Sequence, residues 1–167
     1  MVMISAIIIE MEMARRLSLA WKFTRRLERH FQDRLVSVVL YGSTGRGKVR
    51  HESDIDILII ARDLPRFYYQ RVEIIFPILI EVYKQIKNPP RIEYLILDET
   101  EAQKTSGLDL DLTTDSVVLF DNGFFESKMA DLKQRLRKLN SRKVMVSDNL
   151  WYWDLKPDLK PGEMFEL

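Results

Sequence analysis

Apolar residues along this chain follow two patterns, one typical of amphipathic helices and the other of buried strands. Early in the chain they recur three and four residues apart, with arginine and lysine between them, which predicts a helix over roughly residues 10–32. Residues 35–41 and 55–61 are apolar and β-branched runs, and each predicts a buried strand. The apolar segment before residue 10 predicts a first strand or the beginning of the helix.

The same alternation of helices and strands continues through the middle of the chain. A helix is expected over residues 63–87, where a proline near its start is favourable and Pro77 should kink or split it. Residues 92–97 predict a third strand. A short helix is expected from Glu99, followed by a break at Gly107.

The last third of the chain predicts an edge strand over residues 116–120, a turn over residues 121–123 and a last helix from Phe125 to Leu139. The aromatic tail, about residues 149–167, contains two prolines and is expected to be extended. Because strands alternate with helices, the fold class is α+β, with a small mixed sheet flanked by helices. The length fits a single domain spanning residues 1–167.

Composition excludes several kinds of chemistry. The chain has 167 residues, no cysteine and only two histidines, which excludes disulfides and thiolate catalysis and argues against a histidine-built metal site. The 26 basic and 25 acidic residues give a net charge of +1, so no global charge demands nucleic acid as a partner. The sequence shows no membrane-spanning segment and no signal peptide, so we expect a soluble cytoplasmic protein.

Asp54 and Asp56 are the first candidates for catalytic chemistry. Side chains two residues apart on a strand point to the same face. Two neighbouring carboxylates repel each other, so an apolar strand that carries both needs a compensating charge. Mg²⁺ prefers carboxylate oxygens together with substrate phosphates, and a pair of such ions can clamp both oxygens of a phosphoryl displacement. A solitary pair of this kind is more often structural, with Asp54 as a strand-start or turn residue and Asp56 at a solvated strand end.

The loop before this pair favours the catalytic interpretation. Gly42-Ser43 directly follows a predicted strand, and glycine there permits a sharp turn and a close approach of the backbone to a ligand. A helix starting at Ser43 would offer free N–H groups to an anion. Arg46, Lys48 and Arg50 could add positive charge for a triphosphate, although such residues are also common in solvated loops.

The order strand, Gly-Ser, ten residues, Asp-x-Asp, strand resembles the signature of the DNA-polymerase-β-like nucleotidyltransferase superfamily. Within it the chain is most similar to the minimal nucleotidyltransferases (MNT, MntA-like) of archaea and bacteria, which are often encoded beside HEPN-domain proteins. The resemblance is most specific over residues 38–60. It continues more weakly along most of the chain, and the tail from Trp151 resembles the end of archaeal members.

The resemblance implies a role for each matching position. Gly42 and Ser43, with Arg46 and Lys48, would hold the phosphates of ATP, and Asp54 and Asp56 would bind two Mg²⁺ ions. A third acidic residue would complete the metal site. Glu93 is the best match, as the one charge within an apolar strand, although many relatives use Asp at this position. Four other acidic residues are rival candidates: Asp98, Glu99, Asp109 and Asp111. Asp109-Leu-Asp111 lacks a preceding Gly-Ser and is interpreted as an amphipathic strand or a turn.

The implied function is Mg²⁺-dependent transfer of AMP from ATP to a hydroxyl acceptor, with release of pyrophosphate. Because 167 residues leave little room for an acceptor-binding domain, a partner protein is expected to supply the acceptor. By resemblance this partner would be a HEPN-type toxin encoded nearby, and the chain would act as its antitoxin.

Two other functions remain open at the level of sequence. The chain could be a catalytically weak nucleotide-binding module that neutralises a partner by contact through its aromatic tail. It could also be an RNA- or tRNA-directed nucleotidyltransferase, because the last predicted helix is taken to carry a run of basic residues. These residues are Lys128, Lys133, Arg135, Arg137, Lys138, Arg142 and Lys143. Binding of nucleic acid is possible but not favoured, because such a run is more often a solvated helix face.

Overall fold

The protein is built around a four-stranded mixed sheet with the strand order β3–β2–β1–β4. The computed structural model describes residues 2–48, 53–147 and 150–167, with side chains from residue 7 onward. Strand β1 (Leu35–Tyr41) is antiparallel to β2 (Ile55–Ala61) and to β4 (Val117–Asp121), and β3 (Ile92–Asp98) is parallel to β2. The expected α+β fold with a small mixed sheet is therefore confirmed.

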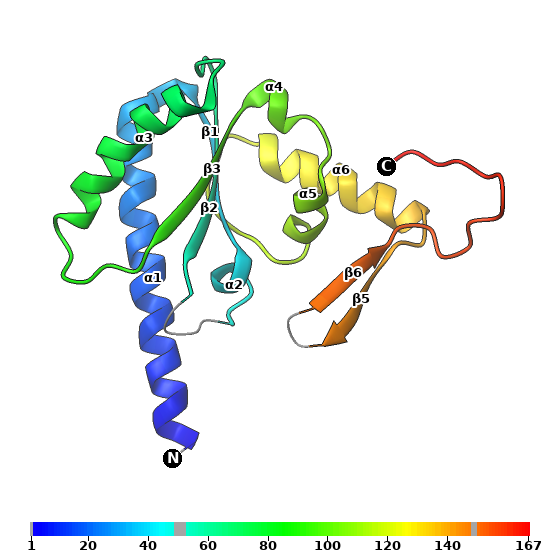
Figure 1. Cartoon of the computed structure of the whole chain (residues 1–167), viewed down its shortest axis with the longest axis horizontal. Coiled ribbons are helices and arrows are strands. Elements are labelled where there is room, and N and C mark those ends of the chain that lie inside the picture. Colours follow the sequence, from blue (N-terminus) through cyan, green and yellow to red (C-terminus); the bar gives the residue numbers. More distant parts are fainter. Residues whose placement is uncertain (1, 49–52, 148–149) are drawn as a thin grey trace.

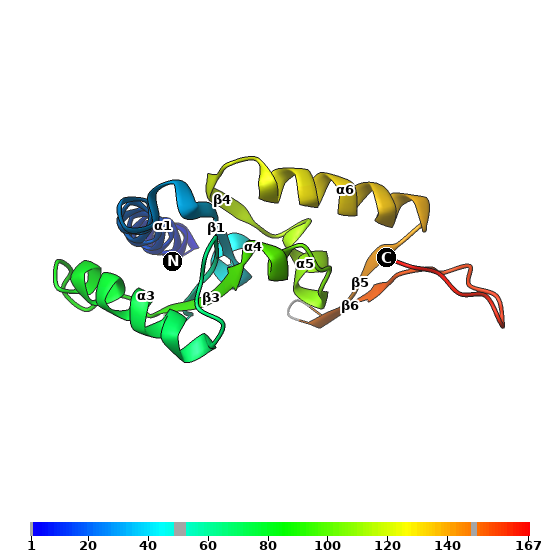
Figure 2. The same cartoon turned by 90° about the horizontal axis from the view of Figure 1, so that it is seen from above.

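Helices cover both faces of this sheet (Figures 1 and 2). Helices α1 (Val2–Phe31) and α3 (Tyr68–Tyr83) lie on one face and share a hydrophobic core with it. Helices α5 (Gly107–Leu112) and α6 (Phe124–Lys138) lie on the other face, where a second core forms. The sheet thus separates two apolar cores, and each strand residue belongs to one of the two faces.

The alternation of side chains along β2 decides where its carboxylate points. Ile57 and Ile59 belong to the core under α1 and α3, whereas Leu58 and Ile60 belong to the core under α5 and α6. Since side chains alternate across a strand, Asp56 shares the face of Leu58 and Ile60. The candidate site therefore opens on the side of the sheet that carries α5 and α6.

Short elements connect the main helices and strands. They are the 3₁₀ helix η1 (Gln32–Arg34) and the helices α2 (Gly42–Gly45) and α4 (Glu99–Ala102). After α6 the chain forms a two-stranded antiparallel hairpin from β5 (Arg142–Ser147) and β6 (Leu150–Asp154). Figure 1 shows this hairpin in orange beside α5. Trp153 and Leu155 pack against the second core, so the hairpin is attached to the body of the protein.

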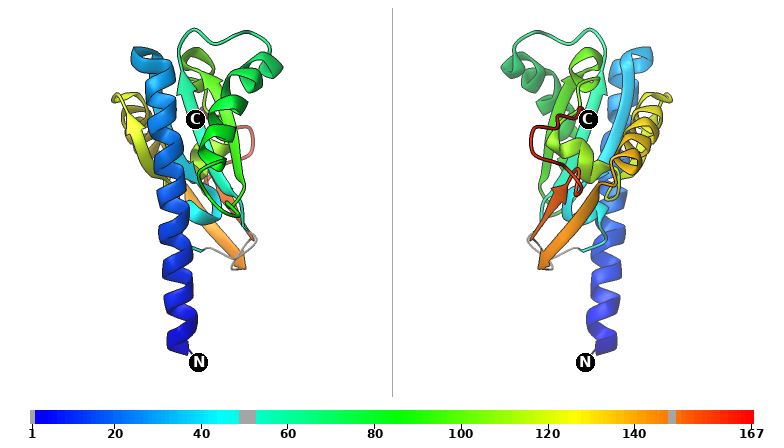
Figure 3. Two further views of the ribbon diagram at one scale, coloured as in Figure 1. Left: turned by 90° about the vertical axis from the view of Figure 1, so that its left-hand side faces the viewer. Right: turned by 90° about the vertical axis from the view of Figure 1, so that its right-hand side faces the viewer.

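The first turns of α1 project beyond the rest of the molecule (Figure 3). Its outermost described side chains include four large apolar residues that are about half exposed or more: Ile7, Ile8, Ile9 and Met11. Among the described residues, no helix combines the length and the apolar character needed to cross a bilayer.

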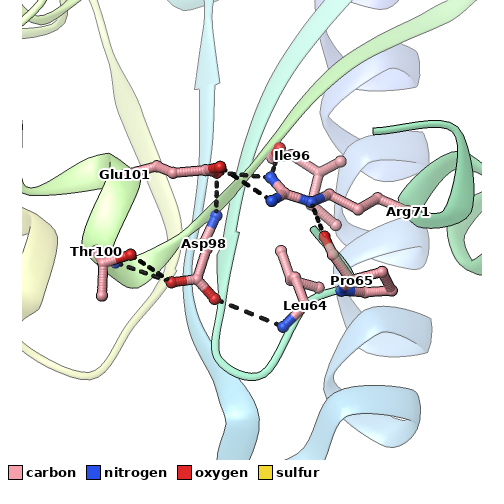
Figure 4. A network of polar contacts seen from close by, with 7 residues as sticks. All are labelled: Leu64, Pro65, Arg71, Ile96, Asp98, Thr100 and Glu101. Carbon is pink, nitrogen blue, oxygen red and sulfur yellow. Dashed lines mark hydrogen bonds and ion pairs between the residues drawn. The ribbon is translucent and has the colours of Figure 1, made fainter. Parts of the chain in front are cut away.

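One polar network joins α3, β3 and α4 (Figure 4). The buried Arg71 of α3 donates two hydrogen bonds to the Glu101 carboxylate, at 2.6 and 2.9 Å, and a third to the Pro65 carbonyl at 2.7 Å. Glu101 also accepts a bond from the Asp98 backbone N–H, while the Asp98 side chain accepts one from Thr100 N–H and so caps α4. The network fixes the end of β3 relative to α3.

Several predicted boundaries need correction. Of the two alternatives for the apolar segment before residue 10, the beginning of the helix is confirmed, because residues 2–9 belong to α1, and the strand is excluded. The third helix begins at Tyr68 and not at residue 63, because Asp63 adopts a left-handed backbone with φ +54°. Pro77 lies inside α3, which remains one helix on both sides of it.

The segment around Asp109 and Asp111 was also predicted wrongly. It forms α5 and neither a strand nor a turn, and it begins with a capping box in which Ser106 and Asp109 satisfy each other's backbone N–H groups. The last helix ends at Lys138, so Arg142 and Lys143 lie on β5 and not on a basic helix. The hairpin itself was not predicted.

Candidate active site

A row of three polar side chains crosses the sheet at the end nearest to α2. The strand registers pair Tyr41 of β1 with Asp56 of β2, and Asp56 with Glu93 of β3. Asp54 directly precedes β2, two residues before Asp56. The structure thus gathers the three acidic residues predicted from the sequence around Asp56.

Gly42 leaves the space that the Asp56 side chain occupies. Its φ of +66° lies in the left-handed region, and a Cβ atom at this position would lie 1.9 Å from Asp56 Oδ2. The turn into α2 therefore needs glycine for its backbone conformation and for its contact with the carboxylate. The next residues are tied to the same place, since Thr44 is buried and its hydroxyl donates to the Asp54 carbonyl at 3.4 Å.

The row concentrates negative charge. Burial raises the pKa of Asp56, and the charges of Glu93 and Asp54 raise it further, whereas Arg46 opposes the rise. Burial also raises the pKa of the Tyr41 hydroxyl, with the charges of Asp56 and Glu93 as the next causes. The site is therefore one that a bound cation would stabilise.

The carboxylates around Asp56 are suitable ligands for a hard divalent cation, but they do not form a complete coordination site. Carboxylate oxygens are the ligands that Mg²⁺ prefers, and a bound cation would offset both the burial of Asp56 and its repulsion by Glu93 and Asp54. Within the described part of the chain, however, no three acidic or histidine side chains are grouped closely enough to hold a metal ion. Glu93 instead pairs with Arg91 at 2.7 Å, and both side chains are largely exposed.

Two of the residues predicted to bind phosphate line the same cavity. Arg46 and Lys48 line a cavity of about 240 Å³ together with Lys143 and Trp151 of the hairpin. The Arg46 guanidinium lies over the Trp151 ring, 4.8 Å from its centroid. Ser43 is half-buried, and its carbonyl accepts a bond from Lys48 N–H at 3.0 Å. Arg50 and His51 lie outside the described residues.

Comparison with known proteins identifies the family of this chain. The family described as "Nucleotidyltransferase domain" matches residues 21–160, which is most of the chain. The chain belongs to this family. The resemblance seen in the sequence and the enzyme class that it implied are therefore confirmed at the level of the family.

Individual relatives are more distant. A Methanocaldococcus jannaschii protein named "Putative protein adenylyltransferase" is 35% identical over 60 residues, which are 36% of this chain and 41% of that protein. The match thus spans less than half of the relative's length. Among solved structures, a "putative nucleotidyltransferase" from Sulfolobus solfataricus superposes with a TM-score of 0.50 at 23% identity, over 68% of this chain and 87% of that one. This second likeness concerns the fold.

A third similar structure is a complex with a described partner. It is the Shewanella oneidensis MNT antitoxin bound to a tri-AMPylated HEPN toxin, with a TM-score of 0.46 and 17% identity over 74% of this chain and 90% of the neighbour.

The rival carboxylates of this nucleotidyltransferase all have structural partners elsewhere. Asp98 caps α4, and Glu99 pairs with Arg62. Asp109 pairs with Lys128, and its carboxylate accepts from the Ser106 backbone. Asp111 accepts hydrogen bonds from both indoles of the hairpin. Of the candidates for a third acidic residue, Glu93 is therefore the one that lies beside Asp56.

Arg16 is a residue of the site that the sequence analysis missed. Its side chain is fully buried on α1, pairs with Glu12 at 3.1 Å, and donates a hydrogen bond to the carbonyl of Ser53, the residue before Asp54. The helical periodicity does contain a signal, because Arg16 falls on the same face as the buried Ala20, Phe23 and Leu27. A charged residue on a buried helix face requires a polar partner inside the protein.

The face that carries Asp56 and Glu93 continues into an apolar cavity. Leu58 and Leu95, the next residues on the same face of β2 and β3, line a cavity of about 260 Å³. Its walls are mostly apolar, and residues of α4, α5 and α6 also line it. This cavity lies over the part of the sheet that follows Asp56 and Glu93 along their strands.

Proposed function

We propose that this nucleotidyltransferase moves AMP from Mg²⁺-bound ATP to a hydroxyl group of a partner protein, with release of pyrophosphate. The observation that carries the proposal is the packing of Gly42 against Asp56, in a row with Glu93 and next to Asp54. A glycine turn pressed against a carboxylate cluster brings a nucleotide backbone site and a metal site together, as phosphoryl transfer requires.

In this proposal one group of residues binds the metal ions and another binds the phosphates. Asp54, Asp56 and Glu93 would hold two Mg²⁺ ions, for which Glu93 must leave Arg91. When bound, the ions supply positive charge that neutralises the triphosphate and lowers the pKa of the attacking hydroxyl. Gly42 and Ser43 let the phosphates approach the backbone. The acceptor oxygen forms a bond to the α-phosphorus while the bond to the departing pyrophosphate breaks.

Arg46 and Lys48 would supply fixed positive charge for the phosphates. Both line the cavity beside α2, and the charge of Arg46 partly opposes the rise in the pKa of Asp56, which supports its action at this carboxylate. The chain itself contributes position and charge rather than a covalent intermediate.

A protein acceptor is supported by the shape and chemistry of the molecule. The cavity over Leu58 and Leu95 has mostly apolar walls, which suits a protein side chain better than the phosphate backbone of a nucleic acid. By analogy with the Shewanella oneidensis complex, the partner would be a HEPN-type toxin and the chain its antitoxin.

The rival binding-module interpretation finds less support. Both Trp151 and Trp153 donate their indole N–H to Asp111, so these rings are engaged within the chain and are not presented as interface anchors.

The proposal is tested by transfer of label from ATP labelled on the α-phosphate, with Mg²⁺ and the protein encoded next to this gene. Labelled partner is expected with the wild type, and the Asp54→Asn/Asp56→Asn double variant should lose the transfer. A matched control changes two exposed aspartates, Asp131→Asn and Asp158→Asn, and should retain full transfer. Full activity of the Asp54/Asp56 variant, or an RNA as the labelled species, would contradict the proposal.

A further inference from the structure

The C-terminal hairpin reaches back to the loop that follows Gly42-Ser43. Trp151 on β6 lies against Arg46, and Lys143 on β5 lies 4.5 Å from the centroid of the same ring. Residues more than 90 positions apart in the sequence thus form one wall of the cavity beside α2. Arg46, Lys143 and Trp151 all line this cavity.

A closed ring of contacts holds this wall in place. Lys143 pairs with Asp115 at 2.6 Å and with Asp111 at 3.2 Å, and Asp111 also accepts the Trp151 indole N–H at 2.8 Å. On the other side, α2 packs tightly against the same turn, because a Cβ atom at Gly45 would lie 2.7 Å from the Asp115 carbonyl. The hairpin is therefore connected to α2 and the loop after it in two ways. One is the contact of Trp151 with Arg46, and the other runs from Lys143 through Asp115 to Gly45.

Charge decides which ligand the cavity suits. The charge of Lys143 is neutralised by Asp111 and Asp115, so Lys143 serves to connect the hairpin to these two residues. Arg46 and Lys48 have no carboxylate within ion-pair distance among the described residues, so their charge remains for a ligand. A planar guanidinium and an ammonium group on one cavity suit phosphate oxygens.

The arrangement also argues against a nucleobase on Trp151. Two cations already lie over its ring, at 4.8 and 4.5 Å from the centroid, and a stacked base would have to displace at least one of them. The ring thus serves to orient Arg46.

We propose that the hairpin is part of the nucleotide site, with Trp151 as a positioning residue that holds Arg46 toward the triphosphate. This inference rests on the proposed function and adds to it a segment outside the sequence motif. Stacking on an aromatic face removes side-chain freedom from Arg46 before the ligand binds, and such preorganisation strengthens binding.

The test measures the dissociation constant of the full-length chain for a Mg²⁺-bound ATP analogue with a methylene bridge between the α- and β-phosphates. Trp151→Leu removes the platform and should raise this constant about 3- to 10-fold, the range expected for a cation–π contact. Trp151→Phe keeps an aromatic face and should stay within about 2-fold of the wild type. With ATP and the acceptor, Trp151→Leu should raise KM by more than it lowers kcat.

Trp153→Phe is the matched control. Trp153 donates to the same Asp111 oxygen as Trp151 but does not stack on Arg46, so its loss reports any general loosening of the hairpin. It should bind the analogue like the wild type. Equal weakening by Trp153→Phe and Trp151→Leu would assign the effect to folding and overturn the inference.

A double-mutant cycle with Arg46→Gln makes the test independent of hairpin stability. If Trp151 acts through Arg46, Trp151→Leu should not raise the dissociation constant further in the Arg46→Gln background. If the two residues act independently, the fold-changes in the dissociation constant would multiply, and this result would refute the coupling. Inorganic tripolyphosphate should lose affinity by the same factor as the ATP analogue in Trp151→Leu. A loss confined to the nucleotide would place the contact at the nucleoside and overturn the phosphate assignment.

The proposed function and the role of Trp151 are contradicted by different results. A wild type that does not bind the Mg²⁺-ATP analogue at millimolar concentration contradicts the proposed function, and the inference falls with it. A wild type that binds, together with a Trp151→Leu variant that binds equally well, contradicts the inference alone.

Discussion

Gly42 determines the geometry of the site through the side chain that it lacks. Any other residue would have to adopt φ +66° and would place its Cβ atom within 1.9 Å of an Asp56 oxygen. Gly47 offers a comparison within the same loop, because its φ is +70° but nothing lies within 4 Å of its missing Cβ. The two glycines thus separate the cost of backbone strain from the cost of displacing the carboxylate.

We predict that Gly42→Ala abolishes nucleotidyl transfer, whereas Gly47→Ala leaves it nearly intact. Both variants should lose roughly 1 kcal/mol of stability from the left-handed backbone. Only Gly42→Ala also displaces Asp56, and a displacement of about 1 Å at a reacting centre can lower the rate on the order of 100-fold. Thermal unfolding and the α-phosphate transfer assay would check this, and equal activity of the two variants would refute the close-contact argument.

Asp56 illustrates how a functional residue can oppose folding. Burial and the charges of Glu93 and Asp54 raise its pKa above the unfolded value, so the ionised carboxylate destabilises the folded state. This destabilisation is present above the folded pKa and is relieved as the pH falls through it, because the folded state then binds the proton more tightly than the unfolded chain.

We therefore predict that Asp56→Asn raises Tm at neutral pH while it abolishes transfer. A gain of about 1 kcal/mol corresponds to roughly 2–4 °C for a chain of this size. The difference from the wild type should shrink on acidification through the folded pKa of Asp56, and added Mg²⁺ should raise Tm of the wild type more than that of the variant. Differential scanning calorimetry over pH tests both points, and a fall in Tm at neutral pH would show that the carboxylate is stabilised in the fold.

At the scale of elements, the polar network around Arg71 connects α3 to β3 and α4. Arg71 is buried, so loss of its partner would leave a charge that water can hardly reach. The neighbouring pair of Arg62 and Glu99 also has a short contact, but its side chains are 47% and 25% exposed. Glu99 and Glu101, two residues apart, thus pair with arginines of different burial, because Arg71 is only 6% exposed although Glu101 itself is 45% exposed.

We predict that Glu101→Gln lowers the free energy of unfolding by about 1–3 kcal/mol and that Glu99→Gln lowers it by less than about 1 kcal/mol. The pKa of Glu101 is held down chiefly by its hydrogen bonds with Arg71. Its contribution is therefore present above the unfolded pKa and is lost as the pH falls through the folded pKa. Urea unfolding of both variants at two pH values measures this, and equal losses would mean that the burial of Arg71 does not matter.

Sequence reasoning found the strands best where burial is complete. The bounds of β1 and β2 were predicted correctly, because both strands are apolar on both faces and carry no competing pattern. Strand β5 escaped notice because its residues are half-buried or exposed and begin with Arg142 and Lys143. Helix α5 was misread because six residues give too little periodicity, although Ser106-x-x-Asp109 carried the capping signal.

The same contrast holds for the candidate site. Gly42, Asp54 and Asp56 come from one continuous motif, and Glu93 could be found as a charge within an apolar strand. The parts that escaped prediction, Arg16 and Trp151, reach the motif from the two ends of the chain. Their contacts depend on how α1 and the hairpin pack, which no local pattern in the sequence specifies.

At the scale of the whole molecule, the distribution of charge argues against a nucleic-acid substrate. Most of the basic residues that suggested such a partner are neutralised by carboxylates: Lys128 by Asp109, Arg135 by Asp131, Arg142 by Asp154, and Lys143 by Asp111 and Asp115. Lys133, Arg137 and Lys138 remain without a carboxylate partner among the described residues of α6. Of the seven basic residues that suggested a nucleic-acid partner, only these three are thus left without an ion pair in the described part of the chain, and the net charge of the sequence is +1.

We therefore predict that reversing all three charges, as Lys133→Glu/Arg137→Glu/Lys138→Glu, leaves transfer to the partner protein within about 2-fold of the wild type, since exposed charges distant from a site act weakly through solvent. The wild type should also show no binding to single-stranded RNA at about 0.15 M salt, because three contacts give little counterion release. Fluorescence anisotropy with labelled RNA across a salt series measures the second point. Tight, salt-dependent binding that the triple variant loses would instead identify α6 as a nucleic-acid-binding surface. It would then favour an RNA over a protein as the acceptor.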